Sequence, residues 1–223
     1  MASAISVTIP TQSKITYLGI IIHASLYLVV KDNCETTLSN VQRDLARWTA
    51  LSASLRSRIA VKMNIAPHVN FLSSMIPLPP PIHFWKKLDT LIRQYIWNNK
   101  QPRVKYSTLQ HTTNTGGLAL PNFKIYHRAF QLWALRVWMD PSSTVPWREI
   151  EQNLTGSLRL QDLAFTGVCP KTCMLAYGPI ITNTLTNFKQ VEEQLRHTNK
   201  WHLTTPIWHN AHLMSGNKPF ACN

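Results

Sequence analysis

Acidic residues are scarce in this chain of 223 residues, and they are almost missing from its middle. The whole chain has 10 Asp and Glu against 23 Lys and Arg, which gives a formal net charge of +13. Between residues 55 and 139 the one acid is Asp89, beside twelve Lys or Arg. Such a surplus typically indicates a partner that supplies negative charge, and a nucleic-acid backbone is the leading expectation. A solvated basic face and a membrane-surface patch are the alternatives.

Disulfide frameworks, leader peptides and membrane spans have little support in the sequence. The four cysteines are irregularly spaced, which favours a reducing compartment. The N-terminus has no basic start followed by an apolar core, so we expect no signal peptide. The apolar stretch at residues 15–30 covers 16 residues with polar interruptions, and a span needs about 20. We therefore expect an intracellular protein of the cytoplasm, the nucleus or both, with no membrane partner.

Motifs that carry catalysis or bind cofactors are also missing. The sequence contains no nucleophile elbow, phosphate loop or dinucleotide fingerprint. We expect no cofactor in this chain and no small-molecule substrate. One zinc hypothesis remains open, because Cys169 and Cys173 precede a group of C-terminal residues that could serve as ligands, namely His197, His202, His209, His212 and Cys222. The spacing matches no common zinc finger, so Cys169 is better interpreted as a small core residue.

The residue patterns predict a mainly α fold with a small N-terminal β element. Residues 15–23 are rich in β-branched residues, and residues 24–30 are interpreted as their hairpin partner or the lead-in to a helix. Together, residues 15–30 are expected to form two buried strands. A helix capped by Asp32 or Asn33 should then bury the stripe Leu38, Val41, Leu45 and Trp48.

Further along the chain, prolines and glycines divide the helices. A helix capped by Ser54 should bend or end at Pro67, and residues 76–81, IPLPPP, should form a stiff spacer. The next helix is predicted to bury Phe84, Leu88, Leu91, Ile92 and Tyr95. Gly116 and Gly117 should allow a positive φ, so that residues 118–120 return as an extended clip. Pro121 and Asn122 should start a helix through Phe123, Tyr126, Phe130, Trp133, Leu135 and Trp138, and another helix is expected at 182–197.

Five segments occur in an order that resembles a known family. They are YLGI, RSRIAVKMNIAPHV after Trp48, IPLPPPIHFWKKLD, YIWNNKQPRVKYSTL and GGLALPNFKIYHRA. This order resembles the region downstream of the catalytic core in non-LTR (LINE-type) retrotransposon reverse transcriptases, over about residues 14–139. The resemblance implies three parts: residues 1–31 as the end of a palm and primer-grip β segment, residues 32–140 as a basic helical thumb-like module, and residues 141–223 as a less regular connecting-region tail.

The resemblance also implies a function and a set of contacts. The chain would be a fragment of an RNA-directed DNA polymerase that grips nucleic acid, either an RNA template, an RNA/DNA hybrid or target DNA. The predicted phosphate contacts are Arg56, Arg58, Lys62, Lys86, Lys87, Arg93, Lys100, Arg103, Lys105, Lys124 and Arg128. Nearby aromatic residues could stack on bases, but core packing is the favoured interpretation of Trp85, Tyr95, Trp97 and Tyr126.

The family's catalytic centre has no counterpart in this sequence. Complete family enzymes hold Mg²⁺ with an early Asp and an aromatic-x-Asp-Asp turn, whereas this chain has no Asp-Asp pair and no acid before Lys14. Glu192 and Glu193 are adjacent but should point to different faces of a helix. We therefore expect part of a longer protein that does not synthesise DNA by itself. A non-binding remnant whose apolar face packed on the missing palm is the alternative, and an active enzyme would need upstream sequence.

Overall fold

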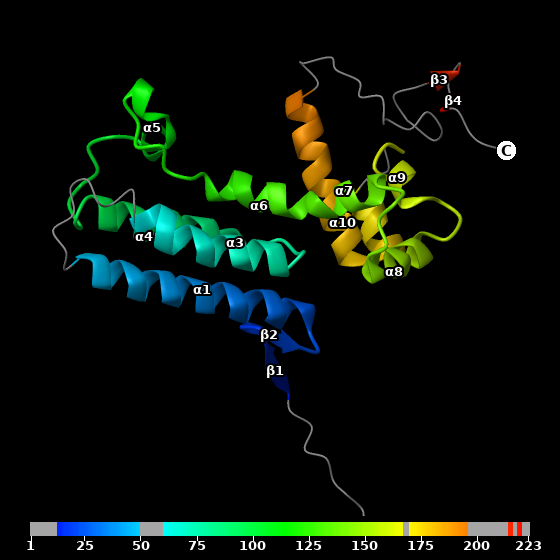
Figure 1. The fold of residues 1–223 in the computed structure, drawn as a ribbon, viewed down its shortest axis with the longest axis horizontal. Helices are drawn as coiled ribbons and strands as arrows, with labels where there is room; N and C mark the ends of the chain where they lie inside the picture. Colours follow the sequence, from blue (N-terminus) through cyan, green and yellow to red (C-terminus); the bar gives the residue numbers. More distant parts are fainter. Residues whose placement is uncertain (1–12, 50–59, 167–169, 196–213, 216–217, 220–223) are drawn as a thin grey trace, which may run out of the picture.

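The computed structural model describes residues 13–49, 60–166, 170–195, 214–215 and 218–219, and these are mostly helical. The predicted mainly α class is confirmed (Figure 1). In chain order the elements are β1 Lys14–Tyr17, β2 Ile20–His23, α1 Leu26–Thr49, the π-helical turn η1 Val61–Ile65, α3 Ala66–Met75, α4 Ile82–Ile96, α5 Tyr106–Gln110, the 3₁₀ turn η2 Thr113–Thr115, α6 Phe123–Gln131, α7 Trp133–Met139, α8 Pro146–Thr155, α9 Leu160–Leu163, α10 Pro170–Leu195, β3 Met214–Ser215 and β4 Lys218–Pro219.

The N-terminal β element is a hairpin shorter than the sequence predicts. β1 and β2 pair antiparallel across the turn Leu18-Gly19, where both residues have positive φ, 47° and 83°. This is the backbone requirement of a two-residue type I′ turn. The expectation of two buried strands over residues 15–30 is wrong in two respects, since all four residues of β1 are exposed and residues 26–30 belong to α1. The lead-in to a helix is therefore the correct alternative for residues 24–30.

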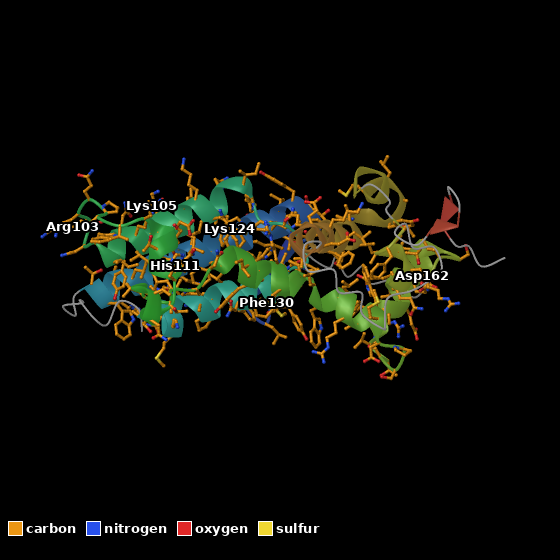
Figure 2. The ribbon with its side chains drawn as sticks, turned by 90° about the horizontal axis from the view of Figure 1, so that it is seen from above. Arg103, Lys105, His111, Lys124, Phe130 and Asp162 are labelled. Atoms are coloured by element: carbon orange, nitrogen blue, oxygen red, sulfur yellow. The ribbon has the colours of Figure 1, made fainter. Side chains whose placement is uncertain are left out.

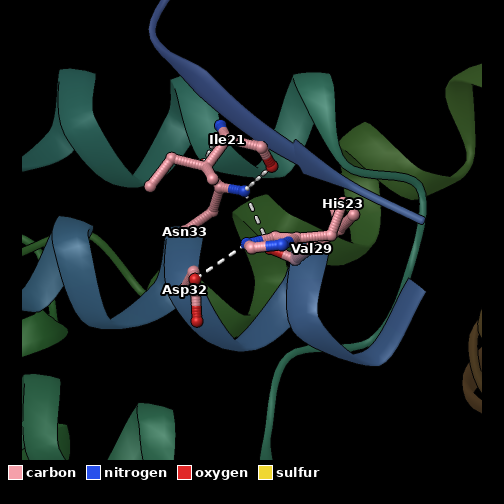
Figure 3. Close-up of polar contacts among 5 residues, drawn as sticks. All are labelled: Ile21, His23, Val29, Asp32 and Asn33. Carbon is pink, nitrogen blue, oxygen red and sulfur yellow. Dashed lines mark hydrogen bonds and ion pairs between the residues drawn. The ribbon is translucent and has the colours of Figure 1, made fainter. Parts of the chain in front are cut away.

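Asn33 joins the hairpin to α1 through its side-chain amide (Figure 3). Its Oδ1 accepts a hydrogen bond from the Ile21 N–H at 2.9 Å, and its Nδ2 donates to the Ile21 carbonyl at 2.7 Å. The amide thus pairs with the outer edge of β2 as a third strand would. Asp32 and Asn33 were expected to cap a helix, but they lie inside α1, because Asn33 is engaged by the strand and Asp32 by His23 at 2.8 Å.

Asn33→Ala is expected to lower the free energy of unfolding by about 2 kcal/mol, because the partly buried Ile21 N–H and carbonyl lose their partner and the buried Asn33 amide is removed. The measurement is urea unfolding followed by circular dichroism. Asn40→Ala on the same helix, which removes an exposed side-chain bond to Arg43 at 2.8 Å, is the matched control and should cost under about 0.5 kcal/mol. Equal losses in the two variants would contradict this role for Asn33.

The first hydrophobic core lies between α1, α3, α4 and the hairpin. α1 packs against both α3 and α4, and α6 packs on α3 from the other side, which gives the stacked arrangement in Figure 1. The largest side chains with under 2% exposure in this core are Phe84, Ile65, Leu88, Ile92, Val41, Val61 and Val69. A polar contact also joins α3 to α1, between His68 Nε2 and Asp44 Oδ2 at 2.9 Å.

Pro67 shapes the helix in which it lies without ending it. The residues just before it form the π-helical turn η1, and Pro67 occupies the first turn of α3, where its missing N–H is tolerated. The bend or end expected at Pro67 is thus a π-helical turn that continues directly into α3. Ser54 lies outside the described residues.

The proline-rich spacer and the helix after it are as predicted. Residues 76–81 have no helical structure, and α4 follows from Ile82 to Ile96. α4 buries Phe84, Leu88, Ile92 and Tyr95, while Leu91 is half-buried. The sequence pattern succeeds here because one apolar stripe faces one layer of helices.

The two glycines before α6 have different physical roles. Gly116 has φ 82° and ends the turn η2, as expected. Gly117 does not have positive φ; it needs glycine because a Cβ would overlap the carbonyl of His111. Behind them residues 118–120 do return against Leu109, since the N–H groups of Leu118 and Leu120 both donate to its carbonyl, at 3.0 and 3.1 Å. The expected extended conformation is wrong at Ala119, which has a positive φ of 47°. Asn122 then caps α6 by accepting from the Ile125 N–H at 3.3 Å.

A second core forms around Trp138, which is fully buried. The other buried members of this core include Leu160, Leu163, Ile181 and Leu185. The indole N–H of Trp138 donates to Glu151 Oε2 at 2.7 Å. α10 begins earlier than the predicted helix at 182–197 and is interrupted at Gly178, which precedes Pro179. The predicted boundary near residue 140 stays a prediction, and α7, which lies on its N-terminal side, packs in this second core.

Buried amides connect α6, α3 and α10. Gln131 Nε2 donates to the carbonyls of Ser73 and Ile76, at 2.8 and 3.2 Å. Asn183 Nδ2 in turn donates to Gln131 Oε1 at 2.7 Å and to the Pro77 carbonyl at 3.3 Å. Gln131 therefore satisfies carbonyls at the C-terminal end of α3, which have no partner within the helix.

Candidate nucleic-acid interface

The predicted basic contacts are mostly on the surface. Arg56 and Arg58 lie outside the described residues. The others divide by burial: Arg93 and Arg128 are half-buried, and the exposed ones are Lys62, Lys86, Lys87, Lys100, Arg103, Lys105 and Lys124. Within the described part of the chain, none of these side chains forms an ion pair with a carboxylate. Their charge is therefore available to a partner.

Two helices bring basic side chains close to Asp89, the single acid of this region. Asp89 and Arg93 lie one turn apart on α4, and Arg93 Nε donates to the Asp89 carbonyl at 3.3 Å. Burial raises the pKa of Asp89, while the nearby charges of Lys124 and Arg93 act to lower this pKa. Burial and Asp89 also raise the pKa of the Tyr106 phenol on α5. Arg93 of α4, Lys124 of α6 and Tyr106 of α5 therefore all lie within electrostatic range of Asp89.

The segment between α4 and α5 adds three exposed cations. α4 ends where Asn98 and Asn99 take left-handed backbone conformations, with φ 46° and 58°, which asparagine tolerates better than most residues. The chain then turns back and exposes Lys100, Arg103 and Lys105. Figure 2 shows Arg103, Lys105 and Lys124 along the same side of the molecule. We call Arg93, Lys100, Arg103, Lys105 and Lys124 the basic surface.

Two other lysines line a separate groove. Lys86 and Lys87, with His83 and Thr90, form the α4 wall of an open groove against α1. Glu35, Ser39 and Gln42 form the α1 wall, so this groove is of mixed charge. Lys62 lies on η1, which contributes no other residue to the predicted contacts. The structure therefore brings together some of the predicted contacts and separates others.

α6 contains the largest error of the sequence prediction. Its buried residues are Phe123, His127 and Gln131, whereas Tyr126 and Phe130 are 44% and 37% exposed. Core packing, the favoured interpretation of Tyr126, is wrong, while it is correct for Tyr95, which is 8% exposed. The expected helix through Trp138 is also divided at Leu132 into α6 and α7. The spacing of Phe123, His127 and Gln131 by four residues was the available signal, but two of the three are polar.

A serine and a histidine meet inside the first core without forming an active site. Ser73 Oγ and His127 Nδ1 are 3.1 Å apart, a distance typical of a nucleophile and its base. The cavity that they share with Cys34 and Trp85 has only about 10 Å³, which is room for one water molecule. Burial raises the pKa of the Cys34 thiol to about 12, so the thiol is neutral. This cluster is part of the core.

Among the described residues, no three His, Cys, Asp or Glu side chains are grouped closely enough to hold a metal ion. The zinc hypothesis stays a prediction, because Cys169, Cys222 and the C-terminal histidines lie outside the described residues. None of the described helices combines the length and the apolar character needed to cross a bilayer. No model of a known protein family matches the chain.

Proposed function

We propose that this chain binds nucleic acid through its phosphate backbone, with the basic surface as the main contact. The observation that carries the proposal is the cluster of cations from α4, α6 and the segment between α4 and α5 that lack carboxylate partners among the described residues. Cations of this kind release counterions when they neutralise phosphates, which gives affinity without base selection. The resemblance to the thumb and connecting region of LINE-type reverse transcriptases supports the same role, with an RNA template, an RNA/DNA hybrid or target DNA as the expected partner.

The experiment is fluorescence anisotropy with a labelled RNA/DNA hybrid at several salt concentrations. Between 50 and 200 mM salt the affinity is expected to fall at least about tenfold. The double variant Lys105→Gln with Lys124→Gln should bind about tenfold more weakly, and the slope of log affinity against log salt should become less steep by about two. Both residues are exposed, so folding should be unaffected.

A matched control removes the same charge elsewhere. Lys14→Gln with Arg43→Gln changes residues of β1 and α1 that are not part of the basic surface, and both residues are exposed. This control should keep the affinity and salt slope close to those of the wild type. An affinity that does not change with salt, or equal losses in the two double variants, would refute the proposal.

An alternative function is docking to another protein or to a missing part of a longer chain. The exposed apolar hairpin supports it: Ile15, Tyr17 and Leu18 are 60, 64 and 69% exposed. Leu18 also has positive φ, a conformation in which Gly or Asn is preferred. This alternative predicts aggregation in the absence of a partner and no nucleic-acid affinity, so light scattering and the anisotropy experiment together distinguish the two functions.

A further inference from the structure

An open groove of about 520 Å³ runs along α6 beside the end of α3. Its lining is Tyr126, Ala129, Phe130 and Trp133 from α6 and α7, with Ser74 from α3. We call this the aromatic groove. Trp133, the largest of its side chains, is 56% exposed. Exposed aromatic groups gathered in one groove typically mark a binding surface.

These aromatic side chains do not hold α6 in place. The helix is attached to α3 and α10 by its other residues: Phe123 is 3% exposed, His127 contacts Ser73, and Gln131 binds the α3 carbonyls. At about 100° per residue, Tyr126 and Phe130 lie on one flank of this buried stripe. Packing within the described chain therefore does not explain why three aromatic residues occupy that flank.

The charge around the aromatic groove is positive. The opposite flank of α6 carries Lys124 and Arg128, and Figure 2 shows Lys124 and Phe130 on different sides of the helix. Arg136 lies over the Trp133 ring, with its guanidinium carbon 5.1 Å from the ring centre. The sequence contains no acid between Asp89 and Asp140. Arg136 thus lies at the groove itself, and Lys124 and Arg128 lie across the helix from it.

Ala129 and Ile125 lie on the solvent side of α6, between the two flanks. Ile125 is 57% exposed, whereas Ala129, which also lines the groove, presents only a methyl group. A polyanion can therefore cross the helix at Ala129, with phosphates toward Arg128 and planar groups toward Phe130. Successive turns of a helix are about 5.4 Å apart, which places Tyr126 and Phe130 as successive platforms.

We propose that the aromatic groove binds the unpaired bases of a single-stranded nucleic acid, which stack on Tyr126, Phe130 and Trp133 while Arg128 and Arg136 contact the backbone. This inference rests on the proposed function and extends it, because it assigns a separate surface to single strands. A duplex has its bases stacked on one another and offers no free base face to the groove. Stacking on aromatic side chains is the usual means of binding single strands without sequence preference.

The test compares a 12-nucleotide single-stranded RNA with a 12-base-pair RNA duplex in anisotropy titrations of the full chain. The variant is Tyr126→Leu with Phe130→Leu, which keeps apolar side chains of similar size. Its affinity for the single strand is expected to fall tenfold or more, and its affinity for the duplex should stay within about twofold. The salt slope should not change, since no cation is removed.

The control is Tyr17→Leu with Tyr27→Leu, a similar exchange at exposed aromatic residues of the hairpin and α1. This control variant should bind both probes as the wild type does.

Equal weakening of both probes by the groove variant, or no weakening of either, would overturn the inference while leaving the proposed function in place. A groove variant that dissociates an oligomer of the wild type in sedimentation would also overturn it, because a second copy would then occupy the groove. No binding of either probe by the wild type would refute the proposed function itself.

Discussion

Replacing Gln131 with leucine is expected to lower the free energy of unfolding by about 4 kcal/mol. Gln131 is 4% exposed, so its partners cannot turn to water when the amide is removed. The carbonyls of Ser73 and Ile76 lose their donor, and Asn183 loses its acceptor. Each buried polar group left unpaired costs about 1 to 3 kcal/mol. Leucine has a similar volume, so the loss reports on hydrogen bonding more than on packing.

The measurement is urea unfolding, with Gln94→Leu as the matched control. Gln94 is exposed on α4, and the same exchange there is expected to change stability by under about 0.5 kcal/mol. A double variant that adds Asn183→Ala should lose less than the sum of the two single losses, because the two amides share a bond at 2.7 Å. A loss below about 1 kcal/mol for Gln131→Leu, or additive losses in the double variant, would show that the network contributes little.

Acidification below about pH 6.5 is expected to destabilise the fold through His127. Burial, with a smaller contribution from Arg128, lowers the pKa of His127 to about 4. The unfolded chain then binds a proton, from about pH 6.5 downward, that the folded chain does not accept until about pH 4. Stability is therefore complete above pH 6.5 and falls through this window, by about 3 kcal/mol in total.

The measurement is the free energy of unfolding at pH 7.5 and pH 4.5 for the wild type and for His127→Gln. The difference between the two pH values should be about 2 kcal/mol smaller in the variant, since glutamine does not titrate. Buried Glu151, whose pKa is raised by burial, contributes with the opposite sign, but it is present in both proteins and cancels in the comparison. His111→Gln, at an exposed side chain, is the control and should keep the pH dependence of the wild type. The same pH dependence in wild type and His127→Gln would contradict the assignment.

The sequence predicted best where apolar residues alone determine the packing. α4 follows a proline spacer and has a single apolar stripe, so its limits and its buried residues Phe84, Leu88, Ile92 and Tyr95 were predictable. The cap at Asn122 and the turn at Gly116 depend on local backbone chemistry, and they were predictable for that reason.

The sequence predicted poorly where polar side chains determine the packing. α6 buries His127 and Gln131 because partners far away in the chain satisfy their polar atoms, and no local pattern reveals those partners. The helical spacing of the apolar residues therefore predicts that Tyr126 and Phe130 are buried, whereas both are exposed. The prediction that Asn33 caps a helix fails for the same reason, since its side chain bonds to the backbone of Ile21, which is distant in the chain.

The basic surface was predictable in composition but not in arrangement. Counting charges identifies Lys105 and Lys124 as candidates, and both are exposed. The chain does not reveal that Arg93 and Lys124 meet at Asp89 from two helices, or that Lys86 and Lys87 lie in a groove against α1. The charge of a surface follows from composition, whereas its shape depends on how the helices pack.

The amide of Asn33 has a consequence for self-assembly. Because this side chain occupies the Ile21 backbone groups, β2 offers little to an incoming strand, and within the described residues β1 is the remaining free edge of the hairpin. Growth of a cross-β fibril needs two free edges on every molecule, one for each neighbour. With a single free edge, strand addition is expected to stop after one event, which favours a closed pair of chains over a fibre.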